Sequence, residues 1–310
     1  MRDMAIYQVD AFTRNPFKGN PAAVALLPEE LLPMSDALRQ DIAAEMNLAE
    51  TAFLECDGPG DFQNSPRFKL RWFTPTMEVP LCGHATLASA AALITACNNS
   101  APELTFSTLS GDLVIRRGGA ERDGNAVALR MDLPHIPPSD AVPEAAAALA
   151  RAAAGGLPVA EVVFAKPLRY LIVALEAGSV TPEELAGAQV DVGAMKAAYS
   201  GADGAIGAVV LACCDPRAAG TVASPHVFSR FFAPWMGVEE DPVTGSAHSV
   251  LAAYYAEKLG RTTLACRQCS RRSGDLTAEV ATQEDGSKRV VLSGDAVLVL
   301  RGTLALPDGS

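Results

Sequence analysis

The chain has 310 residues, of which 49% are hydrophobic and 20% are charged, and this composition is typical of a globular protein. Its length exceeds what one hydrophobic core usually serves, so we expect two domains. The formal net charge is -11, and Lys and Arg do not gather into a stripe, which argues against nucleic acid as a partner.

Cysteine usage and hydropathy indicate a cytoplasmic protein. The seven cysteines are odd in number and irregularly spaced, a pattern that favours reduced thiols. No run of about 18 apolar residues occurs, so no membrane span is expected. Cys266 and Cys269 have zinc-ligand spacing but lack a second Cys or His pair, so half-buried thiols on a strand are preferred. Glycine-rich nucleotide loops are also missing, and the sequence predicts neither a metal nor a cofactor.

Residue periodicity predicts mainly strands in the first half of the chain. Ser35 is a suitable N-cap for a helix over Asp36–Met46, whose apolar residues share one face. A helix rich in small residues is expected from about Gly83 to Cys97. Strands are expected at residues 5–12, 22–27, 51–55, 68–73, 104–107, 113–116 and 127–133.

The second half opens with prolines between Pro134 and Pro143, which mark the expected crossing between domains. An alanine-rich helix over 144–154 should end at Gly155-Gly156, a common helix stop. A second small-residue helix is expected from about Gly245 to Leu259. Strands are expected at residues 159–164, 170–175, 208–211, 227–232, 276–282, 290–294 and 296–304.

Two segments of the chain repeat one another. Arg71-Trp-Phe-Thr-Pro75 leads to Cys82-Gly-His-Ala-Thr86 and a helix, and Arg230-Phe-Phe-Ala-Pro234 leads to Thr244-Gly-Ser-Ala-His248 and a helix. The repeat indicates duplication of a unit in which a curved sheet wraps an apolar helix. Because helix N-termini carry free N–H groups and partial positive charge, a cleft between two of them would suit a small carboxylate.

Four polar segments closely resemble those of the PhzF family, the phenazine-biosynthesis isomerases and their relatives. The resemblance runs from Gln8 to Thr303 and is closest to the animal-type phenazine biosynthesis-like domain proteins, in which segments 229–235 and 268–272 look characteristic. The four segments are Phe17-Lys-Gly-Asn-Pro21, Asn47-Leu-Ala-Glu-Thr51, Cys82-Gly-His-Ala-Thr86 and Glu240-Asp-Pro-Val-Thr-Gly-Ser-Ala-His248.

The resemblance implies an α+β fold of the diaminopimelate-epimerase type. Two pseudo-symmetric domains would each form a curved, barrel-like mixed β-sheet around a central helix, with the active site in the cleft between them. We expect the first domain to cover residues 1–133 and to include a C-terminal strand at about 297–310. The second domain would cover residues 134–296. Family members are often dimers, so a homodimer is expected.

The resemblance also implies three catalytic residues: Glu50, His84 and Asp241. Glu50 matches the glutamate that moves a proton between two positions of one substrate, and such a role calls for a pKa raised by burial. His84 would lie at a helix N-terminus, where the dipole favours its neutral form. Asp241 would polarise the substrate or hold His84. On residue pattern alone, each also fits an ordinary structural role: an exposed glutamate, a half-buried histidine and a turn aspartate.

Backbone N–H groups near Gly83, Gly245 and Ser246 would form an anion cradle, and Asn20 would line the same cleft. A tight turn explains the glycines equally well. Cys82 adds a different possibility, because related racemases place two facing thiols before such helices. Thr244 holds the second of those places and is a poor base, so a two-thiol racemase is not expected.

These residues predict a cofactor-independent isomerase that shifts a proton on a small carboxylate, with Glu50 as general acid/base. Two alternatives stay open. One is a protein-interaction or scaffold member of the family without turnover, and the other is an epimerase or dehydratase that uses the single thiol of Cys82.

Overall fold

The computed structural model describes residues 2–119 and 124–307, and the chain divides into two compact units. The first unit combines Met1–Asp132 with Ser293–Ser310, and the second holds Leu133–Leu292. Residues 308–310 of the expected C-terminal strand lie outside the described residues. No helix in the described part of the chain is both long enough and apolar enough to cross a bilayer.

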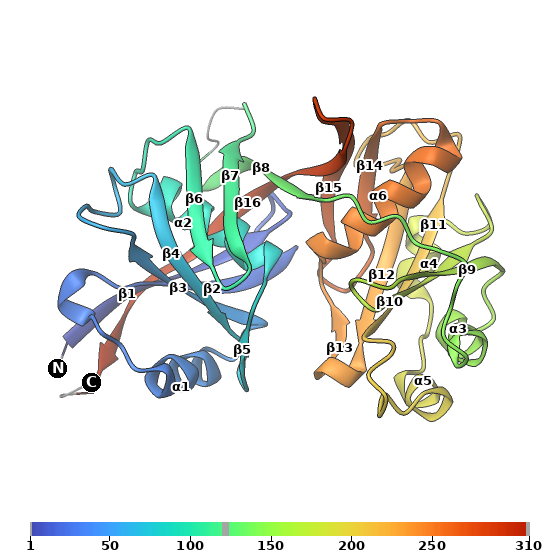
Figure 1. The fold of residues 1–310 in the computed structure, drawn as a ribbon, viewed down its shortest axis with the longest axis horizontal. Coiled ribbons are helices and arrows are strands. Elements are labelled where there is room, and N and C mark those ends of the chain that lie inside the picture. Colours follow the sequence, from blue (N-terminus) through green and yellow to red (C-terminus); the bar gives the residue numbers. More distant parts are fainter. Residues whose placement is uncertain (1, 120–123, 308–310) are drawn as a thin grey trace. The chain divides into compact units, whose positions relative to one another are not determined.

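Over its described residues, the first unit is a mixed barrel of eight strands. The strand order is β1-β2-β3-β4-β6-β7-β8-β16, and β16 also pairs with β1, which closes the ring (Figure 1). Pairs β2–β3 and β4–β6 are parallel. The barrel strands are β1 (Arg2–Ala11), β2 (Asn20–Leu26), β3 (Glu50–Cys56), β4 (Arg67–Phe73), β6 (Glu103–Thr108), β7 (Gly111–Arg117), β8 (Ala126–Pro134) and β16 (Lys288–Leu306). The short strand β5 (Glu78–Val79) pairs with β4 outside the ring.

Helix α2 (Gly83–Ala96) is buried along nearly its whole length, from His84 to Thr95. It packs against β1, β2 and β3. Alanine, serine and threonine predominate, so strands can approach closely on several sides. The hydroxyls of Thr86, Ser89 and Thr95 donate to carbonyl oxygens four residues earlier at 2.6–2.8 Å, which satisfies these polar groups inside the barrel.

The second unit repeats the hydrogen-bonding pattern of the first. Pairs β10–β11 and β12–β14 are parallel, and β9–β10, β11–β12 and β14–β15 are antiparallel, as in β1 to β7. Its central helix is α6 (Gly245–Leu259), which packs against β11, β12, β14 and β15. The strands are β9 (Val159–Ala165), β10 (Tyr170–Leu175), β11 (Ala208–Cys214), β12 (Val227–Ala233), β13 (Val238–Asp241), β14 (Thr263–Gln268) and β15 (Gly274–Thr282).

Both units keep the same half-buried clamp between the fourth strand and the strand after it. Arg71 forms a bidentate pair with Glu78 at 2.7 and 2.8 Å, and its guanidinium lies over the Phe73 ring. Arg230 pairs with Glu240 at 2.7 and 2.9 Å and lies over Phe232. The bidentate geometry fixes the turn that leads into each central helix.

Outer helices cover the sheets. Helix α1 (Asp36–Met46) has the predicted bounds, and the Ser35 hydroxyl accepts the Leu38 N–H at 3.2 Å, which confirms the predicted cap. It packs on β3 and β4 through Ile42 and Ala43. In the second unit, apolar side chains of the helices α3 (Ala146–Ala154), α4 (Pro182–Gly187) and α5 (Val192–Ala198) form one core with β10 to β12. Short 3-10 turns lie at Glu29–Leu31 and Pro234–Met236.

The first turn of α6 contains a buried histidine. His248 Nδ1 donates to the Thr244 carbonyl oxygen at 2.8 Å, the bond that the Thr86 hydroxyl makes in α2. Burial lowers the pKa of His248 to about 4, although the Thr244 carbonyl opposes the shift. The imidazole is therefore neutral in the folded protein at pH 7 and acts as a hydrogen-bond donor.

We predict that the second unit loses stability in mild acid. The pKa of His248 falls from 6.5 to about 4 on folding, so its contribution is full above pH 6.5 and is lost as the pH falls through about 4. The loss should approach about 3 kcal/mol. Urea unfolding of wild type and His248→Gln at pH 7 and pH 4.5 measures it. Equal pH dependence in the two proteins would contradict the assignment.

Candidate active site

Three side chains of different chemistry meet at the N-terminus of α2. Glu50 is the first residue of β3, Cys82 is the N-cap of α2 and His84 is the second residue of that helix. His84 Nε2 lies 3.1 Å from Glu50 Oε2, and His84 Nδ1 lies 3.4 Å from Cys82 Sγ. Only 17% of the Glu50 side chain and 7% of that of His84 is exposed. Glu50 is thus a buried strand residue and not an exposed helix-end glutamate.

Their charge states differ from those that the sequence suggested. Burial acts to raise the pKa of Glu50, but the charge of His84 outweighs it and the pKa stands below its usual value. Burial acts to lower the pKa of His84, but Cys82 and Glu50 hold it well above 6.5. A raised pKa for Glu50 and a neutral His84 were wrong expectations. These two shifts favour a carboxylate on Glu50 and a proton on His84.

This buried pair has a defined pH window. The contribution of Glu50 is present above pH 4.5 and is lost as the pH falls through its lowered pKa. The contribution of His84 is full below pH 6.5 and is lost as the pH rises through its raised pKa. The pair therefore stabilises the first unit most strongly between these limits.

Cys82 is held as a thiol. Burial, reinforced by the negative charge of Glu50, raises its pKa above the usual value. The α2 N-terminus, which lowers the pKa of many reactive cysteines, does not overcome these effects.

Asn20 and Gly83 border the same end of the barrel. Asn20 is the first residue of β2 and is buried. Glu50 pairs with Ala22, two residues farther along β2, so Asn20 and Glu50 lie on the same face of the sheet. A Cβ added at Gly83 would stand 3.2 Å from Met131 Cε, so a larger residue would press on the barrel wall.

The second unit presents Asp241, Thr244 and Ser246 around the start of α6. Asp241 ends β13, and its carboxylate accepts a hydrogen bond from the Thr244 hydroxyl. Thr244 is the N-cap of α6, Gly245 is its first residue and Ser246 its second. The Ser246 hydroxyl is paired with the Tyr170 hydroxyl at 3.0 Å. This end of the unit is lined by oxygen groups.

A buried glutamine fixes the loop between β13 and α6. Gln268 Oε1 accepts the Thr244 N–H at 2.9 Å, and its Nε2 donates to the Asp241 carbonyl at 2.7 Å and to Thr244 Oγ1 at 3.3 Å. The Ser270 hydroxyl donates to the Pro242 carbonyl at 2.7 Å. Sequence analysis identifies residues 268–272 only as a segment characteristic of the animal-type branch. The contacts of Gln268 and Tyr170 depend on strand neighbours, so sequence spacing gave no sign of them.

Strand register shows how the duplicated units have diverged. Phe73 and Phe232 occupy equivalent places, and the residues opposite them are Thr51 and Val209. The equivalent of Glu50 is therefore Ala208. The equivalents of Cys82 and His84 are Thr244 and Ser246, because each pair occupies the same positions of the central helix. The acid/base set belongs to the first unit alone among the described residues.

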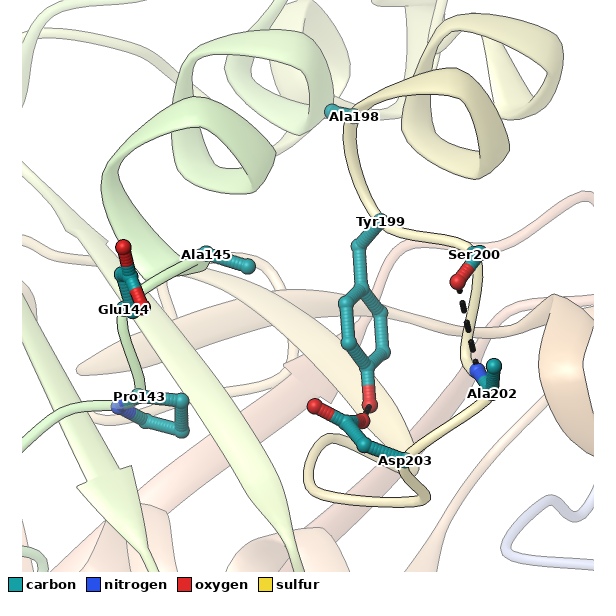
Figure 2. A pocket seen from close by; sticks show the side chains of 8 residues that line it. All are labelled: Pro143, Glu144, Ala145, Ala198, Tyr199, Ser200, Ala202 and Asp203. Carbon is teal, nitrogen blue, oxygen red and sulfur yellow. Dashed lines mark hydrogen bonds between the residues drawn. The ribbon is translucent and has the colours of Figure 1, made fainter.

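A separate hollow of about 560 Å³ lies beside α3 and α5 in the second unit (Figure 2). Pro143, Ala145, Tyr199 and Asp203 are among its lining residues, and the Tyr199 hydroxyl donates to the Asp203 carboxylate. This contact stabilises the turn at Asp203, because the Tyr199 oxygen also accepts the Ile206 N–H. The hollow contains none of the predicted site residues, and we assign it no chemistry.

We predict that Gln268→Leu lowers the free energy of unfolding by about 1–3 kcal/mol, because it leaves buried backbone groups without partners. Urea denaturation measures the change. The matched control is Gln283→Leu, since Gln283 is exposed and should vary by no more than about 0.5 kcal/mol. Equal midpoints for the two variants would show that the glutamine does not hold the loop.

Comparisons with known proteins agree with this architecture. The profile of the phenazine biosynthesis-like protein family PhzC-PhzF matches residues 9–302. The phenazine biosynthesis-like domain-containing protein of Bos taurus is 42% identical over 312 residues, covering 97% of this chain and 99% of the relative. An uncharacterized isomerase of Pseudomonas aeruginosa, PA2770, is 39% identical over 308 residues, covering 98% and 100%.

Solved structures share the fold. A PhzF-family protein of Enterococcus faecalis superposes with a TM-score of 0.77 at 34% identity, covering 98% of this chain and 100% of that one. A hydroxyproline epimerase of Agrobacterium vitis has a TM-score of 0.56 at 14% identity, covering 99% and 94%, and shows a likeness of fold alone. The predicted α+β, epimerase-like class is confirmed, and on the family match the chain belongs to the PhzC-PhzF family of phenazine biosynthesis-like proteins.

Proposed function

We propose that this chain is a cofactor-independent isomerase that shifts a proton between two carbons of a small carboxylate, with Glu50 as the general acid/base. The observation that carries the proposal is the largely buried carboxylate of Glu50, 3.1 Å from the ring nitrogen Nε2 of His84, whose pKa is raised. The family match and the isomerases among the relatives support an isomerase-type role. The cytoplasmic location and the homodimer stay predictions.

The proposed reaction needs one carboxylate and two steps. Glu50 takes a proton from a carbon of the substrate, and the electrons of the broken C–H bond pass into an enolate-like anion. The neutral carboxyl of Glu50 then returns a proton to a second carbon of that anion, which forms the new C–H bond and restores the carboxylate. Electrons and protons balance without a redox partner.

His84 supplies the positive charge for this anion. Its imidazolium is next to the proton-transfer group, so negative charge that develops on the substrate meets a fixed counter-charge in a dry environment. When an anionic substrate pairs with His84, less of that charge acts on Glu50. The basicity of Glu50 would then rise at the moment of reaction.

We assign Asp241 to substrate polarisation and Asn20, Gly83, Gly245 and Ser246 to substrate binding. The hydrogen bonds of Gln268 hold the Asp241 backbone, and the Tyr170 hydroxyl orients Ser246. The first N–H groups of α2 and α6 supply donors for an anion.

A one-thiol epimerase based on Cys82 has less support. Its sulfur is protonated at neutral pH, because burial raises its pKa. Its counterpart Thr244 uses its hydroxyl to bind Asp241. The scaffold alternative does not require the buried charge pair, which is expensive to keep in a protein that only binds partners.

Deuterium exchange tests the proposed base. A panel of small unsaturated and hydroxylated carboxylates is incubated in D2O, and uptake is followed by mass spectrometry. We expect Glu50→Gln to slow uptake by about 100- to 10,000-fold, the usual contribution of a positioned base.

Glu45→Gln is the matched control, because it makes the same charge change on the exposed face of α1. It should exchange at the wild-type rate. Deuterium uptake that persists in Glu50→Gln would show that another residue is the base. Loss of uptake in Cys82→Ser would then identify the Cys82 thiol as that base. Absence of uptake in wild type across the panel would favour the scaffold alternative.

The pH profile of exchange should have two limbs. We expect the rate to fall in acid below pH 4.5, where Glu50 becomes protonated, and to fall in alkali well above pH 6.5, where His84 loses its proton. His84→Asn should be slower and should lack the alkaline limb. An unchanged alkaline limb in this variant would remove His84 from the reaction.

A further inference from the structure

The first unit brings together a thiol, an imidazole and a carboxylate, which are the donor types that zinc prefers. One ligand atom each from Glu50, Cys82 and His84 lie within 4.8 Å of one another. Among the residues that the structure describes, this is the sole grouping of three or more such donors. The thiols of Cys266 and Cys269 do not belong to such a grouping, although their spacing resembles that of zinc ligands.

We propose that Glu50, Cys82 and His84 form a binding site for a thiophilic divalent cation of the Zn²⁺ type. Because a bound ion would occupy the lone pairs of Glu50 and His84, the site would switch off the acid/base chemistry. That inhibitory role rests on the proposed function, whereas the binding itself does not.

The donors lie near one another, and their two shortest separations involve different nitrogens of the His84 ring. Tetrahedral zinc with ordinary bond lengths sets a nitrogen and an oxygen about 3.3 Å apart, and a sulfur and a nitrogen about 3.6 Å apart. The corresponding separations here are 3.1 Å for His84 Nε2 to Glu50 Oε2 and 3.4 Å for His84 Nδ1 to Cys82 Sγ. Because an ion binds only one nitrogen of the ring, the imidazole or the carboxylate must rotate before Glu50, Cys82 and His84 can each supply one ligand atom.

Two polar atoms of this site lack a hydrogen-bond partner, whereas His84 Nδ1 is bonded to Cys82 Sγ. His84 Nε2 and Glu50 Oε2 are buried and have no hydrogen-bond partner among the described residues, despite their 3.1 Å separation. The ring N–H therefore does not point along the line to the carboxylate oxygen. Buried polar groups without partners are unusual, and an ion that both atoms coordinate would satisfy them.

Charge balance also favours a divalent ion. The thiolate and the carboxylate supply two negative charges, so the loaded site is neutral. The N-terminus of α2 disfavours a bare cation but stabilises the Cys82 thiolate at its N-cap. On binding, the thiol and the imidazolium each release a proton to solvent, and the coordinate bonds form from the electron pairs that remain.

Direct metal binding tests this proposal without any substrate. The full chain is stripped with a chelator and titrated with Zn²⁺ alone against a chromogenic competitor, and with Co²⁺ to record a thiolate-to-cobalt charge-transfer band. We expect one ion per chain. Cys82→Ser should lose the band and weaken Zn²⁺ binding by more than about tenfold, since even loss of an outer partner weakens metal sites roughly 10- to 100-fold.

Cys97→Ser is the matched control, because Cys97 is a free thiol in the first unit at the C-terminal end of the same helix. It should keep the wild-type affinity and spectrum. Circular dichroism confirms folding, and Glu50→Gln, which should also bind Zn²⁺ more weakly, provides a second variant if Cys82→Ser is unstable.

Equal Zn²⁺ affinity in wild type, Cys82→Ser and Glu50→Gln, or no stoichiometric binding at all, would overturn the proposal. Because no substrate is used, that outcome leaves the deuterium-exchange test of Glu50 unaffected. Conversely, stoichiometric binding in a chain that exchanges no substrate proton would support the site and remove only its inhibitory role.

Discussion

The ion pair between Glu50 and His84 is the interaction on which the proposed chemistry of this protein depends. Either charge alone would be strongly destabilising inside a barrel, so each group requires the other. The pair forms because β3 begins where α2 begins, and the small residues of α2 let the barrel close around it. The close packing of α2 therefore also places Glu50 beside His84.

The two units share one architecture but differ in the residues at the start of the central helix. Both units keep the strand pattern, the central helix and the arginine–glutamate clamp with its aromatic ring. At the first turn of the helix they differ. Cys82 and His84 face Glu50 in the first unit, whereas Thr244 and Ser246 bind Asp241 and Tyr170 in the second. The first unit thus presents ionisable groups at this place, and the second unit presents hydroxyl groups.

In the second unit, hydrogen bonds from Gln268 and His248 fix the loop ahead of α6. Gln268 holds the loop that carries Asp241, and His248, neutral through burial, holds the helix N-cap. Gln268 bonds to Thr244 and Asp241, and His248 bonds to the Thr244 carbonyl, so the backbone ahead of α6 is held in place. An ion pair in the first unit and a hydrogen-bonded loop in the second thus lie at equivalent places in the fold.

The sequence by itself determined the fold class, the internal repeat, the capped helix at Asp36–Met46 and the family. These follow from periodicity, capping chemistry and ordered motifs, which are local properties of the chain. Only the tertiary structure decided the pKa shifts of Glu50 and His84, because both depend on burial and on the contact between these two residues, which are distant in sequence. The contacts of Gln268 and Tyr170 likewise depend on which strands become neighbours. Local patterns record what a segment prefers, whereas charge and hydrogen-bond partners depend on what folding brings beside it.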